Sequence, residues 1–218
     1  MFLCIAVVVS GWLLWRAFKP SGSASLFSQR KHWSLLLARP MADAMEIEGF
    51  YLPACDHFTE QAQATLRAAL LHQAGIRSSF NAEEVRSHFS ATLEQQWYGL
   101  DLQALTAGDE PRAAMAFACA RVAFLVRCAL LMRWLEPELA WRVLLLNAQR
   151  AQDCFDSWED FGSAYKLGRE QWVATFRVDS LGGGFHEQHL RKLLAPGSGA
   201  WADTHWHTPA ALVPVLAG

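Results

Sequence analysis

The sequence predicts an all-α protein: a compact multi-helix bundle preceded by a single N-terminal membrane-anchor helix. Hydrophobic residues make up 52% of the 218-residue chain and charged residues only 18%, which favours a packed core. Apolar residues recur every three to four positions through much of the body, as on one face of an α-helix. No window shows the sustained alternation that is typical of strands. The formal net charge of −2 gives no overall basic footprint, so we expect no nucleic-acid partner.

The anchor is predicted from an apolar run at the start of the chain, Phe2 to Phe18. Seventeen helical residues span about 25 Å, a little less than a hydrocarbon core of about 30 Å. The first 42 residues hold five basic side chains and no acidic one: Arg16, Lys19, Arg30, Lys31 and Arg39. Because basic flanks stay in the cytoplasm, we expect a single pass through a bacterial inner membrane with the C-terminal domain cytoplasmic. Residues 1–18 would then contact the membrane.

Two alternatives to a retained anchor remain open. Ser21-Gly22-Ser23-Ala24 resembles the end of a cleaved secretory signal, although the basic residues follow the apolar run instead of preceding it. The run also suits a buried helix. The predicted organisation is a transmembrane or signal-anchor segment over 1–19, a linker with a basic collar over 20–40, a helical domain over 41–208 and a tail over 209–218.

Boundary signals divide the helical domain into successive helices. Ser, Thr, Asp or Asn at the N-cap and Pro in the first turn are typical of helix starts. These signals predict helices that begin near Asp56 or Thr59, and near Asn81, Pro111, Pro137, Ser157 and His186.

The helix after Pro111 is apolar on nearly every side and is long enough to imitate a second membrane span. Arginines recur through it at positions 112, 121, 127 and 133, and mid-span arginines are costly in lipid. We therefore interpret it as the central helix of the bundle. Buried arginines need partners, and we expect Arg121 and Arg127 to pair with the acidic cluster of Asp153, Asp156, Glu159 and Asp160.

An aromatic stripe marks the helix that follows Ser157. Its members fall three or four positions apart and so share one helix face: Trp158, Phe161, Tyr165, Gly168, Trp172 and Phe176. The stripe is typical of a core face, with Gly168 allowing a neighbouring helix to approach closely.

The same helix carries the string S-W-x-x-F-x-x-x-Y-x-x-G-R-x-x-W. Its seven positions are Ser157, Trp158, Phe161, Tyr165, Gly168, Arg169 and Trp172. Upstream are an alanine-rich helix with Arg121 and a helix with Trp141, and downstream is Trp201. Over roughly residues 60 to 205 the chain resembles the bacterial domain-of-unknown-function family numbered 1266. The resemblance implies a helical bacterial domain and no established activity, so it supplies no catalytic residue.

Two functional hypotheses follow. The first is a non-enzymatic, membrane-tethered domain that binds a protein partner in an accessory role, such as immunity to a toxin. The ten tryptophans favour it, since tryptophan is enriched at binding hot spots. The alternative is an enzyme or small-ligand sensor with a pocket for an anionic or planar ligand. Its candidate residues are Arg121, Tyr165 and Arg169, with walls from Trp158 and Trp172.

We expect no cofactor and no metal. The late histidines His186, His189, His205 and His207 are weak metal candidates, because no H-E-x-x-H pattern accompanies them. We also identify no catalytic residue.

Overall fold

Helices form the fold wherever the computed structural model describes the chain, which it does for residues 22–93, 105–176, 184–197 and 201–207. Within these ranges there is no β-strand, which confirms the all-α class. The anchor predicted over residues 1–19 lies outside the described residues.

The described helices differ widely in length, from short turns to a helix of 21 residues. In chain order they are α2 (Gly22–Leu36), α3 (Arg39–Ala42), the 3₁₀ helix η1 (Asp43–Met45), α4 (Glu60–Gln73), α5 (Ala82–Thr92), α7 (Pro111–Leu131), α8 (Pro137–Cys154), α9 (Trp158–Phe176) and α10 (Glu187–Leu194).

The predicted helix starts are confirmed by their caps. Thr59 Oγ1 accepts a hydrogen bond from the amide of Ala62 at the start of α4. At the start of α5, Asn81 Oδ1 accepts from the Glu84 amide at 3.0 Å while the Glu84 carboxylate accepts from the Asn81 amide at 2.7 Å. This reciprocal pair satisfies two amides that the helix itself cannot bond.

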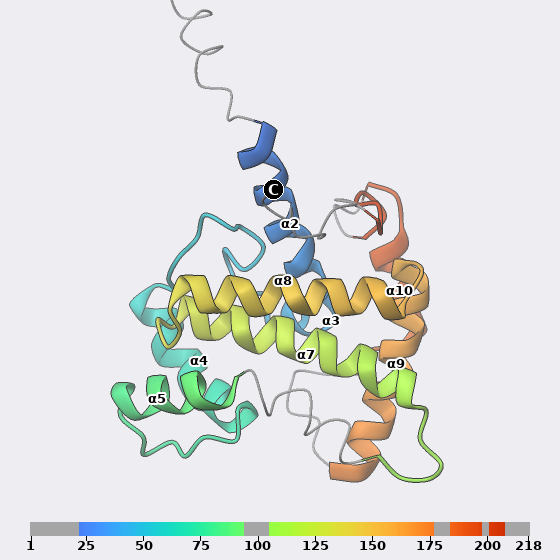
Figure 1. Cartoon of the computed structure of the whole chain (residues 1–218). Coiled ribbons are helices and arrows are strands. Elements are labelled where there is room, and N and C mark those ends of the chain that lie inside the picture. Colours follow the sequence, from blue (N-terminus) through green and yellow to red (C-terminus); the bar gives the residue numbers. More distant parts are fainter. Residues whose placement is uncertain (1–21, 94–104, 177–183, 198–200, 208–218) are drawn as a thin grey trace, which may run out of the picture.

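Helix α7 is the centre of the domain, and it packs mainly against α9 and α8. Figure 1 shows α7 and α8 side by side, with α2 crossing them. Among the described helices, α7 is long and apolar enough to cross a membrane, yet 89% of its most apolar stretch is buried inside the domain. The apolar composition of α7 is therefore explained by its burial among the other helices of the domain.

Most of the segment predicted as a linker over residues 20–40 is helical, because residues 22–36 form α2. The second half of this helix is part of the core: Trp33 is 2% exposed, and Leu35 and Leu36 are fully buried. Packing of this half against α8 and α7 stabilises a helix that begins with Gly and Ser, residues with weak helix preference.

At Gly168, helices α9 and α7 approach each other closely. A Cβ placed on Gly168 would lie 2.0 Å from the carbonyl oxygen of Ala113 and 3.1 Å from the Cβ of Phe117. The first contact is with backbone, so it cannot be relieved by rotating a side chain. The close packing predicted for Gly168 is therefore present.

We expect Gly168→Ala to lower the free energy of unfolding by about 1–3 kcal/mol, because the two helices must separate. This expected loss of stability is opposite in sign to the usual gain of roughly 0.5–1 kcal/mol when alanine replaces glycine within a helix. Thermal unfolding followed by circular dichroism measures the change. Gly108→Ala is the matched control, since no described atom lies within 4 Å of its Cβ. Equal stability of the two variants would contradict the expected clash.

The partners of the α7 arginines differ in part from the acidic cluster that the sequence predicts. Arg127 is fully buried, and its Nε donates to the carbonyl of Phe50 at 2.9 Å. Its Nη2 donates to the carbonyls of Leu52 at 2.7 Å and Cys55 at 3.0 Å. Arg121 likewise donates to a carbonyl, that of Gln73, at 2.9 Å. Backbone carbonyls are strong acceptors for guanidinium donors, so these hydrogen bonds do not require a carboxylate, and Arg127 Nη1 has no hydrogen-bond partner among the described residues.

The acidic cluster instead pairs with Arg112 at the start of α7. Arg112 Nη1 donates to Asp160 Oδ1 at 2.9 Å, and Nη2 donates to Oδ2. Asp160 also accepts from the Asp156 amide, while its own amide donates to Ser157 Oγ at 3.1 Å in the predicted cap. The hydrogen bond from Arg112 is the main reason that the pKa of Asp160 is lowered.

The Asp160 pKa predicts a pH-dependent contribution to stability. Since its folded pKa lies below its unfolded value near 4, the stabilisation is present above about pH 4 and is lost as the pH falls through the folded pKa. Both side chains are partly exposed, so we expect Asp160→Asn to cost about 0.5–1 kcal/mol at neutral pH. Unfolding measured from pH 7 to pH 3 should show the gap to wild type closing on the acid side. Glu159→Gln is the control, and a gap that does not vary with pH would disprove the linkage.

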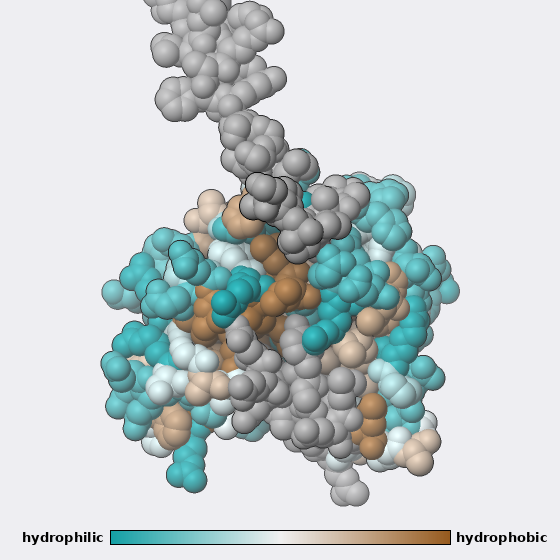
Figure 2. Space-filling view, viewed as in Figure 1, coloured by the Kyte–Doolittle hydropathy of each residue, from teal (hydrophilic) through white to brown (hydrophobic). Residues whose placement is uncertain are grey.

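The described surface is mostly hydrophilic, with a local exception. Figure 2 shows hydrophobic residues gathered over α7 and α8 at the centre of the viewed face. Among the described residues, four large apolar side chains are notably exposed: Phe27 at 47%, Leu52 at 63%, Leu146 at 63% and Leu167 at 42%. Phe27 belongs to α2, and Leu52 belongs to the loop that follows η1.

Candidate functional site

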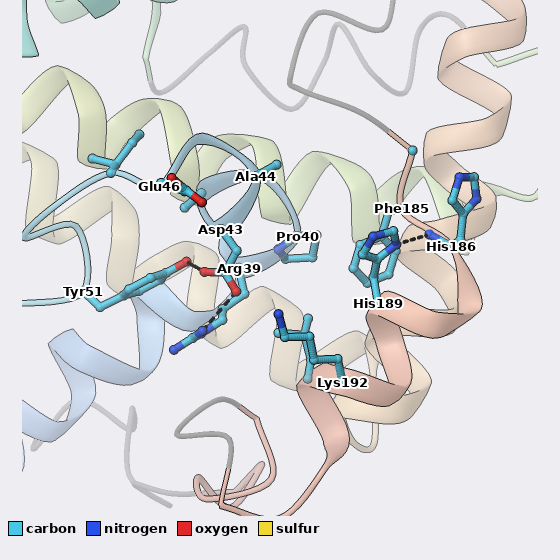
Figure 3. A pocket seen from close by; sticks show the side chains of 14 residues that line it. Arg39, Pro40, Asp43, Ala44, Glu46, Tyr51, Phe185, His186, His189 and Lys192 are labelled. Carbon is cyan, nitrogen blue, oxygen red and sulfur yellow. Dashed lines mark hydrogen bonds and ion pairs between the residues drawn. The ribbon is translucent and has the colours of Figure 1, made fainter.

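A polar groove of about 870 Å³ lies between the α3–η1 segment and α10. Figure 3 shows Arg39, Asp43 and Tyr51 on one side and His186, His189 and Lys192 on the other. We call it the α3–α10 groove. Its lining is completed by Pro40, Ala42, Ala44, Glu46, Ile47, Gly184, Phe185 and Leu193.

The α3 side of the groove is held by a short network centred on Asp43. Arg39 Nη1 donates to Asp43 Oδ2 at 3.0 Å, and the Tyr51 hydroxyl donates to Asp43 Oδ1 at 2.5 Å. The Arg39 guanidinium also lies 4.5 Å from the centroid of the Tyr51 ring. Glu46, in the left-handed region with φ of 48°, ends η1 and turns the chain towards Tyr51.

This network fixes the charge state of the tyrosine. Burial and the nearby Asp43 carboxylate raise the pKa of Tyr51 far above its ordinary value. Tyr51 therefore remains a neutral hydrogen-bond donor, and Asp43 and Arg39 offset each other's charge.

The α10 side presents nitrogen donors three positions apart, and so on one helix face. His189 Nδ1 accepts a hydrogen bond from the His186 amide at 3.0 Å, at the start of α10. Nδ1 of His189 is therefore unprotonated, and Nε2 carries the ring proton of the neutral form. Lys166 of α9 donates to Glu187 at 3.0 Å and ties α10 to the bundle.

Together the two sides offer hydrogen-bond donors, the carboxylate of Glu46 and the ammonium of Lys192. The described lining contains no serine, threonine or cysteine that could act as a nucleophile.

Of these residues, the sequence singles out only His186 and His189. Arg39, Asp43, Tyr51 and Lys192 belong to no motif, and they meet α10 only through folding. The i, i+4 spacing of Arg39 and Asp43 is the one local signal that could have indicated the ion pair.

The motif residues Trp158 and Phe161 lie in an aromatic cluster formed with Trp33, Trp201 and Trp206. The Trp158 ring stacks on Trp201 at 5.1 Å and lies 4.9 Å from Trp33 and 4.7 Å from Trp206. Two of the indole N–H groups bond to distant carbonyls: that of Trp158 to Thr204 at 2.7 Å, and that of Trp201 to Leu36 at 2.9 Å. The cluster thus joins α2, α9 and the 201–207 segment.

The motif residues further along α9 lie in a different aromatic group. Phe117 stacks on Tyr165 at 5.8 Å, and its ring is tilted against that of Trp172 at 5.3 Å. Arg121 lies 5.0 Å from the Trp172 ring. Burial raises the pKa of Tyr165, and the positive charge of Arg169 opposes that rise.

These contacts show how far the predicted Arg/Tyr/Trp pocket converges. Arg121 and Trp172 meet, and Tyr165 joins them through Phe117, whereas Trp158 belongs to the cluster at the other end of α9. Tyr165 is 2% exposed, packed between Phe117 and Phe185. The structure therefore does not bring all five candidate residues around one space.

Trp141 and Ser157 have separate local roles. The Trp141 ring lies 4.5 Å from Lys31 Nζ and 5.5 Å from the Arg127 guanidinium, so two cations flank it. Burial, and secondarily the charge of Arg127, lower the pKa of Lys31. Ser157 accepts the Asp160 amide and caps α9.

The late histidines form two pairs. His186 and His189 have ring centroids 5.7 Å apart, and His205 and His207 have ring centroids 5.9 Å apart. Among the described residues, no group of three or more His, Cys, Asp or Glu side chains is placed to hold a metal ion.

The fold and the groove define a small all-helical domain with two aromatic groups along one helix and a polar groove at its edge. The chain belongs to DUF1266, a family of proteins of unknown function, which matches residues 29–206. The match begins inside α2 and ends at Trp206, so it starts well upstream of the resemblance seen in the sequence. No curated protein and no solved structure matches the chain.

Proposed function

We propose that this chain is a membrane-tethered, non-enzymatic helical domain of a bacterium that binds a protein partner in an accessory role. The observation that carries the proposal is the α3–α10 groove. Its size and its mixture of acidic, basic and aromatic groups match what a polar peptide segment requires.

The charges of the groove argue for recognition. Asp43 already accepts from both Arg39 and Tyr51, so its carboxylate is held in place. Lys192 and Glu46 then offer opposite charges to an incoming segment. Opposite charges at fixed positions set the register and orientation of a partner.

The tether is supported by the chain that precedes α2. The apolar run to Phe18 and the basic residues behind it suit a span with its flank in the cytoplasm. We expect the full chain in the membrane fraction and a chain without residues 1–18 in the soluble fraction. Recovery of the full chain as a soluble protein would overturn the tether.

Photo-crosslinking in cells tests the groove as the binding site. A benzoylphenylalanine at position 46 or 192 lies in the groove, whereas one at position 175 lies on an exposed turn of α9. We expect the same crosslinked protein from both groove positions and none from position 175. Adding Lys192→Glu to the position-46 chain should abolish that product.

Two results would contradict the proposal. One is identical products from positions 46, 192 and 175, which would mean random encounters. The other is the absence of any product from the groove in cells where the chain is expressed at its natural level.

A further inference from the structure

We propose that a pocket beside Trp33 binds an uncharged, proline-containing segment of a partner protein, and that a carbonyl of this segment accepts a hydrogen bond from the Trp33 indole N–H. The pocket has a volume of about 390 Å³ and lies between α2 and the loop that follows η1. We call it the Trp33 pocket. Such a site requires neither the membrane tether nor a partner in the α3–α10 groove. The lining consists of Ser28, Gln29, His32, Trp33, Tyr51, Leu52, Pro53 and Thr204.

Trp33 differs from the other tryptophans of its aromatic cluster in its hydrogen bonding. The indole N–H groups of Trp158, Trp201 and Trp206 each donate to a backbone carbonyl, at 2.7 Å, 2.9 Å and 2.9 Å. The Trp33 N–H is buried and has no hydrogen-bond partner among the described residues. Buried indole N–H groups usually have an acceptor, and a buried donor without one is costly. The tryptophan that lacks an acceptor is thus the one that lines this pocket, so we infer that the occupant carries the acceptor.

His32 supplies a complementary acceptor in the same lining. Its Nδ1 lies 3.0 Å from the carbonyl oxygen of Tyr51. A carbonyl can only accept, so Nδ1 carries the ring proton and Nε2 of the neutral ring is an acceptor. A peptide backbone matches both neighbours, because its C=O can accept from Trp33 and the N–H of a residue other than proline can donate to His32.

The charges in and around the pocket favour an uncharged occupant. The described lining contains no Lys, Arg, Asp or Glu. Arg30 and Lys31 of α2 disfavour a cationic segment, because like charges that meet at an interface are costly. An anionic segment is disfavoured in the same way by the exposed acidic residues of the adjoining loop, which are Asp43, Glu46, Glu48 and Asp56.

The walls of the pocket suit proline. The rings of Trp33, His32 and Tyr51 lie in the lining together with Pro53, and Leu52 is 63% exposed beside them. Aromatic-lined grooves bind proline-rich segments, whose polyproline II conformation is already formed before binding and therefore costs little entropy. A polyproline II segment has no internal hydrogen bonds, so its carbonyls are available to the Trp33 N–H.

Nuclear magnetic resonance of the full-length chain in detergent, with isotope-labelled tryptophan indoles, tests the site. The probe is an acetylated and amidated peptide of Ala-Pro-Pro repeats. Comparison peptides have Glu-Pro-Pro, Arg-Pro-Pro or Ala-Gln-Ser repeats. We expect the Trp33 N–H signal to move downfield and to saturate as the Ala-Pro-Pro peptide is added, because the proton gains an acceptor. The Trp206 signal should move far less, since its N–H already donates to the carbonyl of Phe155.

Variants of the pocket should weaken binding of the Ala-Pro-Pro peptide. We expect Trp33→Phe, which keeps a ring but removes the N–H, and Leu52→Ser to raise the dissociation constant about three- to tenfold. Leu52→Ser changes an exposed side chain, so it tests the site even if Trp33→Phe destabilises the core. Leu167→Ser is the matched control, because Leu167 is an exposed leucine of α9. Tyr51 is left unchanged, since it also lines the α3–α10 groove.

Several outcomes would overturn the proposal. They are an Ala-Pro-Pro peptide that does not bind, binding that leaves the Trp33 signal in place, and equal losses in Leu52→Ser and Leu167→Ser. Equal affinity for a charged peptide or for the Ala-Gln-Ser peptide would overturn the ligand class. Binding that appears only after residues 208–218 are removed would assign the pocket to that segment, which contains Pro209 and Pro214, and would overturn the assignment to a partner. Crosslinking from positions 46 and 192 tests the α3–α10 groove separately.

Discussion

Replacing Arg127 with methionine is expected to lower the free energy of unfolding by about 3–5 kcal/mol, because several carbonyls of the 49–55 loop lose their donor at once. Arg127 is fully buried, and it is the donor that holds the 49–55 loop on α7. Without it, the carbonyls of Phe50 and Cys55 lose the hydrogen bonds that the guanidinium makes to them. An unsatisfied buried carbonyl costs about 1–3 kcal/mol.

Urea unfolding and limited proteolysis measure the effect of Arg127→Met. We expect the unfolding midpoint to fall and new cleavage to appear within residues 49–57. Arg127→Lys should lose less stability, because an ammonium keeps the charge but not the planar arrangement of donors. Arg142→Met is the control, since Arg142 is an exposed arginine of α8. An Arg127→Met chain as stable as the Arg142→Met chain would disprove the role given to the guanidinium.

The second large effect is expected for Trp158→Ala, at about 3–5 kcal/mol. Its ring contacts those of Trp33, Trp201 and Trp206, and its indole N–H donates to the carbonyl of Thr204. Removal leaves a cavity among three tryptophans and frees an acceptor. We therefore also expect the 201–207 segment to detach.

Hydrogen exchange separates local detachment from overall unfolding. The amide of Ala202, which donates to the carbonyl of Leu193, should exchange faster in Trp158→Ala. The amides of α7 should change only as far as overall stability falls. Trp158→Phe keeps a ring without the N–H, so we expect an intermediate loss of stability. If Trp158→Ala leaves the Ala202 exchange rate unchanged, Trp158 does not hold this segment.

The helices were largely predictable because their starts are local. Asn81 with Glu84, and the prolines at 111 and 137, act on amides within one helical turn, so short stretches of sequence identify them. The start of α2 was not predicted, because the interactions that stabilise this helix are not local. Gly22 and Ser23 are poor helix formers, and α2 is stabilised by the distant α8, which no local pattern reveals.

The aromatic stripe of α9 was predicted, but its division between two separate aromatic groups was not. Periodicity places Trp158 and Trp172 on one face, yet a 19-residue helix is long enough for its two ends to meet different neighbours. Trp158 contacts α2 and the 201–207 segment, whereas Trp172 contacts α7. Sharing a helix face therefore did not mean sharing a pocket.

The α3–α10 groove and the partners of Arg127 could not be predicted for a common reason. The groove joins side chains that lie far apart in the chain and belong to no motif. Arg127 bonds to backbone carbonyls, which every residue carries, so its partners leave no signature in the sequence. Carboxylates can be recognised in the sequence as possible partners of a buried arginine, but the carboxylate of Asp160 pairs with Arg112 instead.

The hydrogen bond between Trp201 and Leu36 has a consequence for biosynthesis. It joins residues 165 positions apart. At a translation rate of about 5–20 residues per second, Trp201 emerges roughly 8–33 s after Leu36. During that interval the Trp33 side of α2 has no tryptophan from the C-terminal segment to cover it. A chain that ends before residue 201 would leave this surface open, so chains truncated before Trp201 should be more sensitive to protease than the full chain.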